Sequence, residues 1–464
     1  MLVSLRQLKF VGSLLKAVYL GDFEEIRKKP DMERHWFWLY ITTFTVLWGA
    51  YQLNKEPVAT FHSKSFNNSI EITNSTTSNA VITKGSRAST SLQLVIAVAR
   101  HGNRASDFSV AMPLCYPVND TNTWPYGPGQ LTNKGRLQMH RLGKRIRSLY
   151  DGFISQYYLP EQVMAYTKDE SRLVMSAELL LAGLFPPRGY QVWNSDLLWQ
   201  PVPVFRNYKE HTRRAIPVNA SACPKFQRAQ ASSLEQYEEK YGRNVTDLVE
   251  YVQRATGINI VNDVPRNFVD HNLYRIALWF IWESIIHAVR SLTDNEGLKL
   301  PDWATRIYPD PIAHLISELT KAYATASDTQ IKLFQGEIFQ EIISFMQHKV
   351  EQMKAPKRFY LYTFHDGTIF GLMHILGHSN YSVVQAKTGS ALIFELHRDP
   401  QSGGHYVKVV FINGATQELE LSEVNIPGCD SPCDFHLLCN ITEKYYNVED
   451  WKKECENLVK EMFC

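Results

Sequence analysis

Residues 92–104 read LQLVIAVARHGNR, and this stretch decides the fold. Its first eight residues are apolar apart from one glutamine. They include β-branched side chains, which is typical of a strand buried on both faces, as in parallel α/β sheets. Polar residues follow at once. Because α/β folds bind ligands at the carboxyl ends of their strands, the sequence predicts an α/β protein with a functional site directly after this strand.

Three basic residues lie within the five that follow the strand, namely Arg100, His101 and Arg104. Gly102 allows a tight turn and a close approach of the backbone. Two guanidinium groups can form bidentate hydrogen bonds to one phosphate, and a histidine between them is placed to attack the phosphorus. The alternative is a solvated basic loop, but the buried strand before it favours a ligand site.

A second junction of the same kind occurs at residues 358–376, which read RFYLYTFHDGTIFGLMHIL. The pattern indicates a strand, a polar junction and an apolar helix. His365 and Asp366 would then lie at the helix N-terminus, where backbone N–H groups and the helix dipole favour an anion. The alternative reading of Asp366 is an ordinary helix N-cap.

These two junctions resemble those of the histidine acid phosphatases, a branch of the histidine phosphatase superfamily, and the prostatic and lysosomal members are the most similar. Other blocks agree in order over about residues 92–455. The resemblance implies a phosphoglycerate-mutase-like, histidine phosphatase α/β sandwich with an inserted α-helical cap. The further blocks are GQLT at 129–132, SRLVMS at 171–176, LFPP at 184–187, WQPVP at 199–203 and DWKKEC at 450–455.

The resemblance also implies roles for individual residues. His101 would be the nucleophile that forms a phosphohistidine, and Asp366 would protonate the leaving-group oxygen. Because such an acid must be neutral when substrate arrives, activity should favour acidic pH. Arginines would supply the positive charge, so neither a metal nor a cofactor is expected. The phosphate-binding groups would be Arg100, Arg104, Arg172 and His365.

The sequence departs from the family pattern at two positions near this site. Ser106 stands where proline is common after RHG-x-R, and Gly367 follows His-Asp where threonine or serine is frequent in the prostatic type. Neither residue is a predicted catalytic group. The departures therefore bear on substrate preference more than on activity.

The catalytic domain is expected to span residues 91–464. Strand patterns are sparse between about Pro201 and Ser344, so we predict a helical cap at 201–344, inserted into an α/β core formed by 91–200 and 345–464. The alternative is a separate domain with its own function, but the site needs both flanking halves.

Several helices and strands can be predicted from local patterns. Apolar residues at helical spacing predict a helix through 142–153 with Thr132 as a cap upstream, and another through 331–345. A third pattern begins at Thr246 and stops at Gly257. Between 391 and 421 the sequence predicts strands, with a hairpin turn at Asn413-Gly414. We therefore expect helices before and within the cap and a β-rich region near the C-terminus.

An uncharged run near the N-terminus, residues 36–53, reads WFWLYITTFTVLWGAYQL, which is just long enough to cross a bilayer and is aromatic at both ends. The alternatives are a buried helix and a signal peptide, although no small-residue cleavage site follows. Seven Lys and Arg residues precede the run, and only Lys55 and Lys64 occur in the next twenty residues. We therefore predict a cytoplasmic tail (1–35) and a single-pass type II anchor.

The segment after the anchor, residues 54–90, is predicted to be a stalk, because 14 of the 32 residues from Thr60 to Ser91 are Ser or Thr. The domain beyond it would lie in the secretory or lysosomal lumen or outside the cell. Sequons for N-glycosylation all follow the anchor, as this topology requires. They begin at Asn67, Asn74, Asn119, Asn219, Asn244, Asn380 and Asn440.

The chain has seven cysteines, so at least one is unpaired within the chain or bonded elsewhere. The family resemblance implies the disulfides Cys223–Cys455 and Cys429–Cys433. The remaining residues Cys115, Cys439 and Cys464 allow one further bridge, and the sequence does not choose among them.

A net charge of +2 argues against a nucleic-acid partner, and a phosphate monoester is the expected substrate. A Golgi phosphatase for a phosphorylated glycan sugar is one alternative, because such an enzyme would share the type II topology. A phosphatase for lipids of the lysophosphatidic acid type is another. A non-catalytic binding protein on the same fold is the alternative from a different class. A homodimer is expected from the family resemblance alone.

Overall fold

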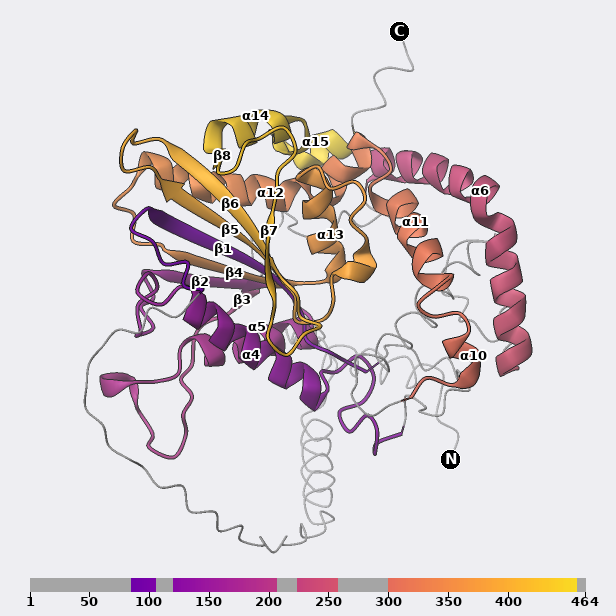
Figure 1. Cartoon of the computed structure of the whole chain (residues 1–464), viewed down its shortest axis with the longest axis horizontal. Helices are drawn as coiled ribbons and strands as arrows, with labels where there is room; N and C mark the ends of the chain where they lie inside the picture. The colour runs from indigo at the N-terminus through magenta and orange to yellow at the C-terminus, as the bar shows by residue number, and fades with distance from the viewer. Residues whose placement is uncertain (1–84, 106–119, 207–222, 258–298, 457–464) are drawn as a thin grey trace, which may run out of the picture. The chain divides into compact units, whose positions relative to one another are not determined.

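The structure is a computed structural model that describes residues 85–105, 120–206, 223–257 and 299–456 (Figure 1). The predicted tail, the predicted anchor and nearly all of the predicted stalk lie outside these residues. Within the described part of the chain, no helix is both long and apolar enough to cross a bilayer.

One mixed β-sheet organises the domain, in the order β3-β2-β4-β1-β5-β6-β7, with β8 paired to β6. The first four strands of this order run parallel, and the pairings from β1 onward to β5, β6 and β7 are antiparallel. The strand at the start of the domain was predicted correctly, but it has a parallel neighbour on one side only. The strands are β1 (Leu92–Arg100), β2 (Val163–Thr167), β3 (Phe205–Arg206), β4 (Phe359–Phe364), β5 (Ala391–Arg398), β6 (His405–Ile412), β7 (Leu421–Val424) and β8 (Cys433–Asp434).

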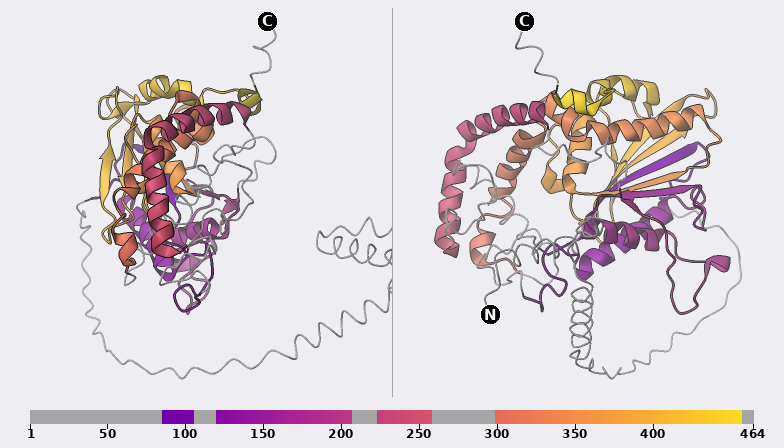
Figure 2. Two further views of the ribbon diagram at one scale, coloured as in Figure 1. Left: turned by 90° about the vertical axis from the view of Figure 1, so that its right-hand side faces the viewer. Right: turned by 180° about the vertical axis from the view of Figure 1, so that it is seen from behind.

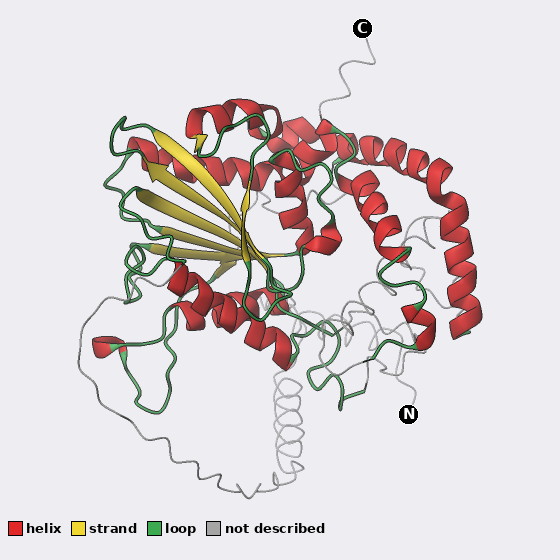
Figure 3. Cartoon of the chain, in the orientation of Figure 1, coloured by secondary structure: helices red, strands yellow, loops and turns green. Residues whose placement is uncertain are grey.

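Helices cover both faces of the sheet, and three more, α6, α10 and α11, lie to one side of it (Figures 2 and 3). Their bounds are α4 (Asn133–Leu149), α5 (Ser171–Leu184), α6 (Pro224–Thr256), α10 (Asp302–Thr305), α11 (Ile312–Ala324), α12 (Asp328–Glu351), α13 (Asp366–Ile375), α14 (Phe435–Tyr446) and α15 (Trp451–Glu456), with 3-10 turns η1 (Gly189–Gln191) and η4 (Val383–Gln385).

The alternation of side chains along β1 explains why the sheet is covered on both faces. Leu94, Ile96 and Val98 pack into a core shared with α12, α13 and α14. Val95 and Ala97 point the other way and pack into a second core with α4 and α5. All five side chains are almost completely buried, as the uninterrupted apolar run predicts.

Helix α4 begins where the sequence predicts it. The Thr132 hydroxyl accepts a hydrogen bond from the Gly135 backbone N–H at 3.0 Å, which makes Thr132 the N-cap. The helix ends at Leu149, so Phe153 lies beyond it, although this ring still packs into the core beneath α4.

The prediction of a helix start at Thr246 is wrong, since α6 begins at Pro224. Thr246 lies inside the helix, where its hydroxyl donates to the Gly242 carbonyl one turn earlier. That bond occupies a side chain that would otherwise cap a helix. The stop at Gly257 is correct, because this glycine has φ +74° and ends the helix in the left-handed conformation.

The predicted hairpin turn at Asn413-Gly414 is also different in the structure. These residues follow β6 and begin the longer connection 413–420 to β7. A Cβ on Gly414 would lie 2.1 Å from the Thr388 carbonyl oxygen and would clash with it. The glycine therefore serves a close approach to the loop at 388–390, where its N–H donates to the Ser390 hydroxyl.

Helices α6, α10 and α11 lie in the region predicted to be the cap. Helix α6 packs against α11 and α12. Their apolar residues form a cluster separate from the two sheet cores, which also takes in Phe370 of α13. The predicted boundary at Ser344 falls inside α12, which also packs on the sheet. The helical cap at 201–344, inserted into the α/β core, stays a prediction.

The structure contains both disulfides that the resemblance implies. Cys223–Cys455 joins the start of α6 to α15, with 4.9 Å between the Cα atoms. Cys429–Cys433 closes the short loop before β8. Cys439 on α14 forms no disulfide and is partly buried. Cys115 and Cys464 lie outside the described residues, so the remaining pairing stays open.

Three of the predicted glycosylation sites lie in the described part of the chain. Asn244, Asn380 and Asn440 are all exposed, as attachment of a glycan requires. The other four, Asn67, Asn74, Asn119 and Asn219, lie outside it.

Candidate active site

The two polar junctions meet because β1 and β4 are parallel neighbours. Arg100, the last residue of β1, pairs with Phe364, the last residue of β4. His101 and His365 come next in their chains, and the backbone N–H of His101 donates to the Phe364 carbonyl at 3.0 Å. The two imidazole rings lie edge to face with 5.4 Å between their centroids.

The loop after β1 packs tightly against the first turn of α4. A Cβ on Gly102 would lie 2.3 Å from the Gly135 carbonyl oxygen, and one on Gly135 would lie 1.9 Å from the carbonyl oxygen of Asn103. Only glycine fits at either position. The loop also contacts α5, since the Gly102 N–H donates to the Ser176 hydroxyl, which in turn donates to the Arg172 carbonyl at 2.6 Å.

His101 is 3% exposed and its imidazole is held in one tautomer. Nδ1 lies 2.8 Å from the Gly102 carbonyl oxygen, and because a carbonyl can only accept, Nδ1 carries the proton. Burial and then the charges of Arg100, His365 and Arg104 hold the pKa of His101 well below its usual range. The ring is therefore neutral, with its lone pair on Nε2.

Arg100 and Asp366 form an ion pair between the two junctions. Nη2 of Arg100 lies 3.1 Å from Oδ2 of Asp366, while Nη1 donates to the Ala386 carbonyl at 2.6 Å. The other carboxylate oxygen, Oδ1, accepts from the N–H of Gly367 at 2.9 Å. Asp366 is thus the first residue of α13, as predicted, and His365 is its N-cap.

The remaining predicted groups come from two other segments. Arg104 is 6% exposed, and its Nη1 donates to the Ala105 carbonyl at 3.0 Å. Its charge contributes to the lowered pKa of His101, so it lies close to that ring. Arg172 enters from the first turn of α5. All six predicted site residues therefore come from segments that meet at the carboxyl ends of β1 and β4.

Glu170 is a site residue that the sequence reasoning missed. Its Oε1 lies 3.2 Å from Nε2 of His365 and 2.7 Å from Nζ of Lys168, and its Oε2 lies 2.8 Å from Nη2 of Arg172. The only signal in the sequence is a carboxylate two residues before a predicted phosphate-binding arginine. That signal also fits a helix cap, yet Glu170 makes no side-chain capping bond to α5.

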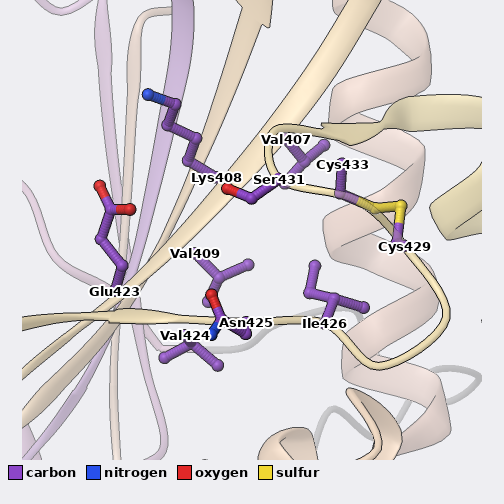
Figure 4. A pocket seen from close by; sticks show the side chains of 10 residues that line it. All are labelled: Val407, Lys408, Val409, Glu423, Val424, Asn425, Ile426, Cys429, Ser431 and Cys433. Atoms are coloured by element: carbon purple, nitrogen blue, oxygen red, sulfur yellow. A yellow bond between two sulfur atoms is a disulfide. The ribbon is translucent and has the colours of Figure 1, made fainter.

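Of the two departures from the family pattern, only Gly367 lies in the described chain. A Cβ there would make an ordinary van der Waals contact with the Phe334 ring at 3.5 Å, so a side chain at this position would not clash. A separate pocket between β6, β7 and the Cys429–Cys433 loop is shown in Figure 4, and none of the predicted site residues line it.

Comparison with solved structures supports the fold. A phytase of Hafnia alvei aligns over 77% of this chain and 97% of its own, with a TM-score of 0.58 and 15% identity. A phytase of Klebsiella sp. ASR1 aligns over 77% and 96%, with a TM-score of 0.54 and 17% identity. At these identities the likeness shows the fold alone, and together with the family match given next it confirms the predicted histidine phosphatase α/β fold.

The sequence itself places the chain in a family. The sequence pattern of the histidine phosphatase superfamily (branch 2) matches residues 91–412. Prostatic acid phosphatase of Rattus norvegicus is 30% identical over 370 residues, which cover 78% of this chain and 89% of that protein. Lysosomal acid phosphatase of Homo sapiens is 28% identical over 391 residues, with coverages of 82% and 83%. The chain therefore belongs to branch 2 of the histidine phosphatase superfamily, and the family and these relatives support a phosphoric monoester hydrolase.

Proposed function

We propose that this protein is an acid phosphatase that hydrolyses phosphate monoesters through a phosphohistidine on His101. The observation that carries the proposal is the state of His101 itself. The ring is buried, neutral and protonated on Nδ1, which leaves the Nε2 lone pair for attack. A neutral imidazole among cationic groups is the form that a nucleophile needs beside an anionic phosphate.

In the first step, Nε2 of His101 forms a bond to phosphorus and the bond from phosphorus to the ester oxygen breaks. The carboxyl group of Asp366 gives its proton to that oxygen, which leaves as an alcohol. The ion pair with Arg100, the residue before His101, supports this placement because it holds the carboxyl group of Asp366 beside the loop of His101.

In the second step, water attacks the phosphohistidine and Asp366, now ionised, accepts its proton. The bond between nitrogen and phosphorus breaks, its electron pair returns to Nε2, and inorganic phosphate leaves. Because Asp366 must carry a proton before the first step, the activity is expected to favour acidic pH.

Positive charge for the transferring phosphoryl group would come from four side chains. Phosphoryl transfer needs mainly alignment and compensation of charge, and clustered guanidinium groups supply both. No step requires a metal or a cofactor. The proposed phosphate-binding groups are Arg100, Arg104, Arg172 and His365.

The test is release of p-nitrophenol from p-nitrophenyl phosphate by the full-length chain in detergent, between about pH 4 and pH 8, beside His101→Ala. We expect activity in the wild type with an acidic optimum and none above background in the variant. Equal activity of both proteins would overturn the assignment of His101. Inactivity of both would favour a non-catalytic binding protein.

We further propose that a type II anchor at residues 36–53 holds the protein in a membrane. The catalytic domain that follows it would lie in the secretory or lysosomal lumen or outside the cell. The support is the charge asymmetry around this segment and the exposure of the described sequons. The name of the lysosomal relative agrees with this placement. Treatment of the cell-made protein with a glycosidase should increase its gel mobility, and unchanged mobility would contradict a luminal domain. The expected homodimer stays a prediction.

A narrower substrate is the second candidate function. The predicted type II anchor supports a Golgi phosphatase for a phosphorylated glycan sugar as this alternative. A panel of sugar, lipid and nucleotide phosphates at one concentration tests this. If kcat/KM for one class of phosphate exceeds that for the others by more than about tenfold, that class is identified as the substrate.

A further inference from the structure

The carboxylate of Glu170 occupies two of the groups that are proposed to bind phosphate. Its oxygens contact Nε2 of His365 at 3.2 Å and Nη2 of Arg172 at 2.8 Å, and Nζ of Lys168 lies 2.7 Å away. This arrangement places an anion of the protein within the phosphate-binding cluster. No step of the proposed reaction uses it.

Glu170 is ionised over the whole acidic range in which the enzyme is proposed to work. The hydrogen bond with His365 is the largest cause that holds the pKa of Glu170 far below its usual range, followed by burial in the opposite direction and by the charge of His365. The side chain is 22% exposed, so solvent screens it only in part.

We propose that Glu170 determines substrate specificity by competing with phosphate for His365 and Arg172, so that the site favours monoesters whose organic group carries no further negative charge. This inference rests on the proposed function. A phosphate bound to His365 and Arg172 lies within about 3 Å of each group. It therefore also lies close to the carboxylate of Glu170, which the same two groups already hold. Each additional negative charge on the substrate adds to this repulsion.

Two opposing effects decide whether a substitution at Glu170 strengthens or weakens phosphate binding. Its ion pairs hold His365 and Arg172 in position, so their loss would weaken phosphate binding. Ion pairs between partly exposed groups, however, orient side chains only weakly. Repulsion between two anions that share donors at close range is the stronger effect. Removal of the charge is therefore expected to strengthen phosphate binding.

The experiment compares the full-length wild type with Glu170→Gln at about pH 5, by titration calorimetry with inorganic phosphate and by kinetics with p-nitrophenyl phosphate and inositol hexakisphosphate. Asp169→Asn is the matched control. It removes the same charge one residue away, where Asp169 is 73% exposed and pairs with Arg206. Glu170→Asp is the second variant, since it keeps the charge and changes only the reach.

In Glu170→Gln we expect the Kd for inorganic phosphate and the KM for p-nitrophenyl phosphate to fall by about tenfold, with kcat changed by less than about threefold. The KM for inositol hexakisphosphate should fall further. Asp169→Asn should stay within about twofold of the wild type in all three measurements, and Glu170→Asp, which keeps the charge but has less reach, should fall between the wild type and Glu170→Gln.

Two results would overturn the inference. One is phosphate affinity in Glu170→Gln equal to or weaker than in the wild type while the circular dichroism spectrum is unchanged. The other is a loss of kcat with unchanged KM, which would make Glu170 a residue that only orients His365. Phosphate binding is measured without turnover, so an inactive wild type whose phosphate affinity still rises in Glu170→Gln would overturn the proposed function and leave the competition intact.

Discussion

The imidazole rings of His101 and His365 lie edge to face, 5.4 Å apart, because β1 and β4 are parallel and end in register. His101 is the first residue after β1, and His365 is the first residue after β4. The two junctions therefore meet at one site, although most of the domain separates them in sequence. The chemistry proposed above depends on this relationship.

Trapping of the proposed intermediate tests the nucleophile directly. After rapid mixing with a phosphate-labelled ester and quenching in base, the wild type should carry label on histidine, and the bond should be labile to acid. His101→Ala should carry no label and should lose about 10³-fold or more in kcat. Label that persists in the variant would place the nucleophile elsewhere.

Asp366→Asn should reduce turnover in a way that depends on the leaving group. An alkoxide needs a proton more than p-nitrophenolate does, so kcat for an alkyl phosphate should fall by about 10²–10⁴-fold and that for p-nitrophenyl phosphate by much less. The ratio of the two rates is the measurement. An equal loss with both substrates would contradict a general acid.

Substitution of two glycines at the site should have opposite outcomes. Gly102→Ala brings a Cβ to 2.3 Å from the Gly135 backbone, which cannot move aside, so the loop of His101 should shift and activity should be lost. Gly367→Ala meets only the Phe334 ring at 3.5 Å and should keep the fold. Thermal unfolding and phosphatase assays on both variants test this, and normal activity of Gly102→Ala would contradict the packing.

Burial of His374 should make the protein less stable in acid. Burial lowers the pKa of His374 to about 4, so between about 6.5 and 4 the unfolded chain binds a proton that the folded protein does not. Stability should therefore fall by about 1.4 kcal/mol per pH unit as the pH drops through this window. Urea unfolding at several pH values measures the slope.

His374→Gln is the control for this slope. Nε2 of His374 lies 3.1 Å from the Tyr381 carbonyl oxygen and, facing a carbonyl, donates to it. Glutamine can also donate to that oxygen but does not titrate, so the variant should lose less stability than the wild type between pH 6.5 and 4. Equal slopes for the two proteins would show that His374 is not responsible.

The segment before β1 should be held by a buried carboxylate. Glu395 is completely buried, and Nη2 of Arg87 lies 2.7 Å from one oxygen while the Tyr150 hydroxyl donates to the other at 2.6 Å. Arg87→Met would leave this charge buried without its main partner and should cost about 3–5 kcal/mol in urea unfolding. Arg254→Ala, which breaks an exposed pair with Glu250, should cost less than about 0.5 kcal/mol.

Acid should weaken the same cluster. Burial alone would raise the pKa of Glu395, but the bonds from His397 and Arg87 outweigh it and the pKa is lowered overall. The stability that this carboxylate contributes is therefore present above about pH 4.5 and is lost as the pH falls through the lower folded value. A stability profile that is flat below pH 4.5 in the wild type would contradict this.

Much of the fold could be predicted because its signals are local. The apolar run at 92–99 specifies a strand buried on both faces, and the Thr132 side chain caps the helix α4 that follows it. Thr246 misled the prediction because a hydroxyl can bond one turn back as readily as cap a helix. Gly414 was misread because its contact with Thr388 cannot be seen in the neighbouring sequence.

The sequence by itself determined the strand ends, the polar residues that follow them and the family to which the chain belongs. Tertiary structure alone decided that Glu170 turns away from the α5 cap toward His365, and that Glu395 is buried against Arg87. The physical reason is the range of the interactions. Periodicity and capping act over a few residues, whereas a charge takes its role from whichever partner the folded chain brings within about 3 Å.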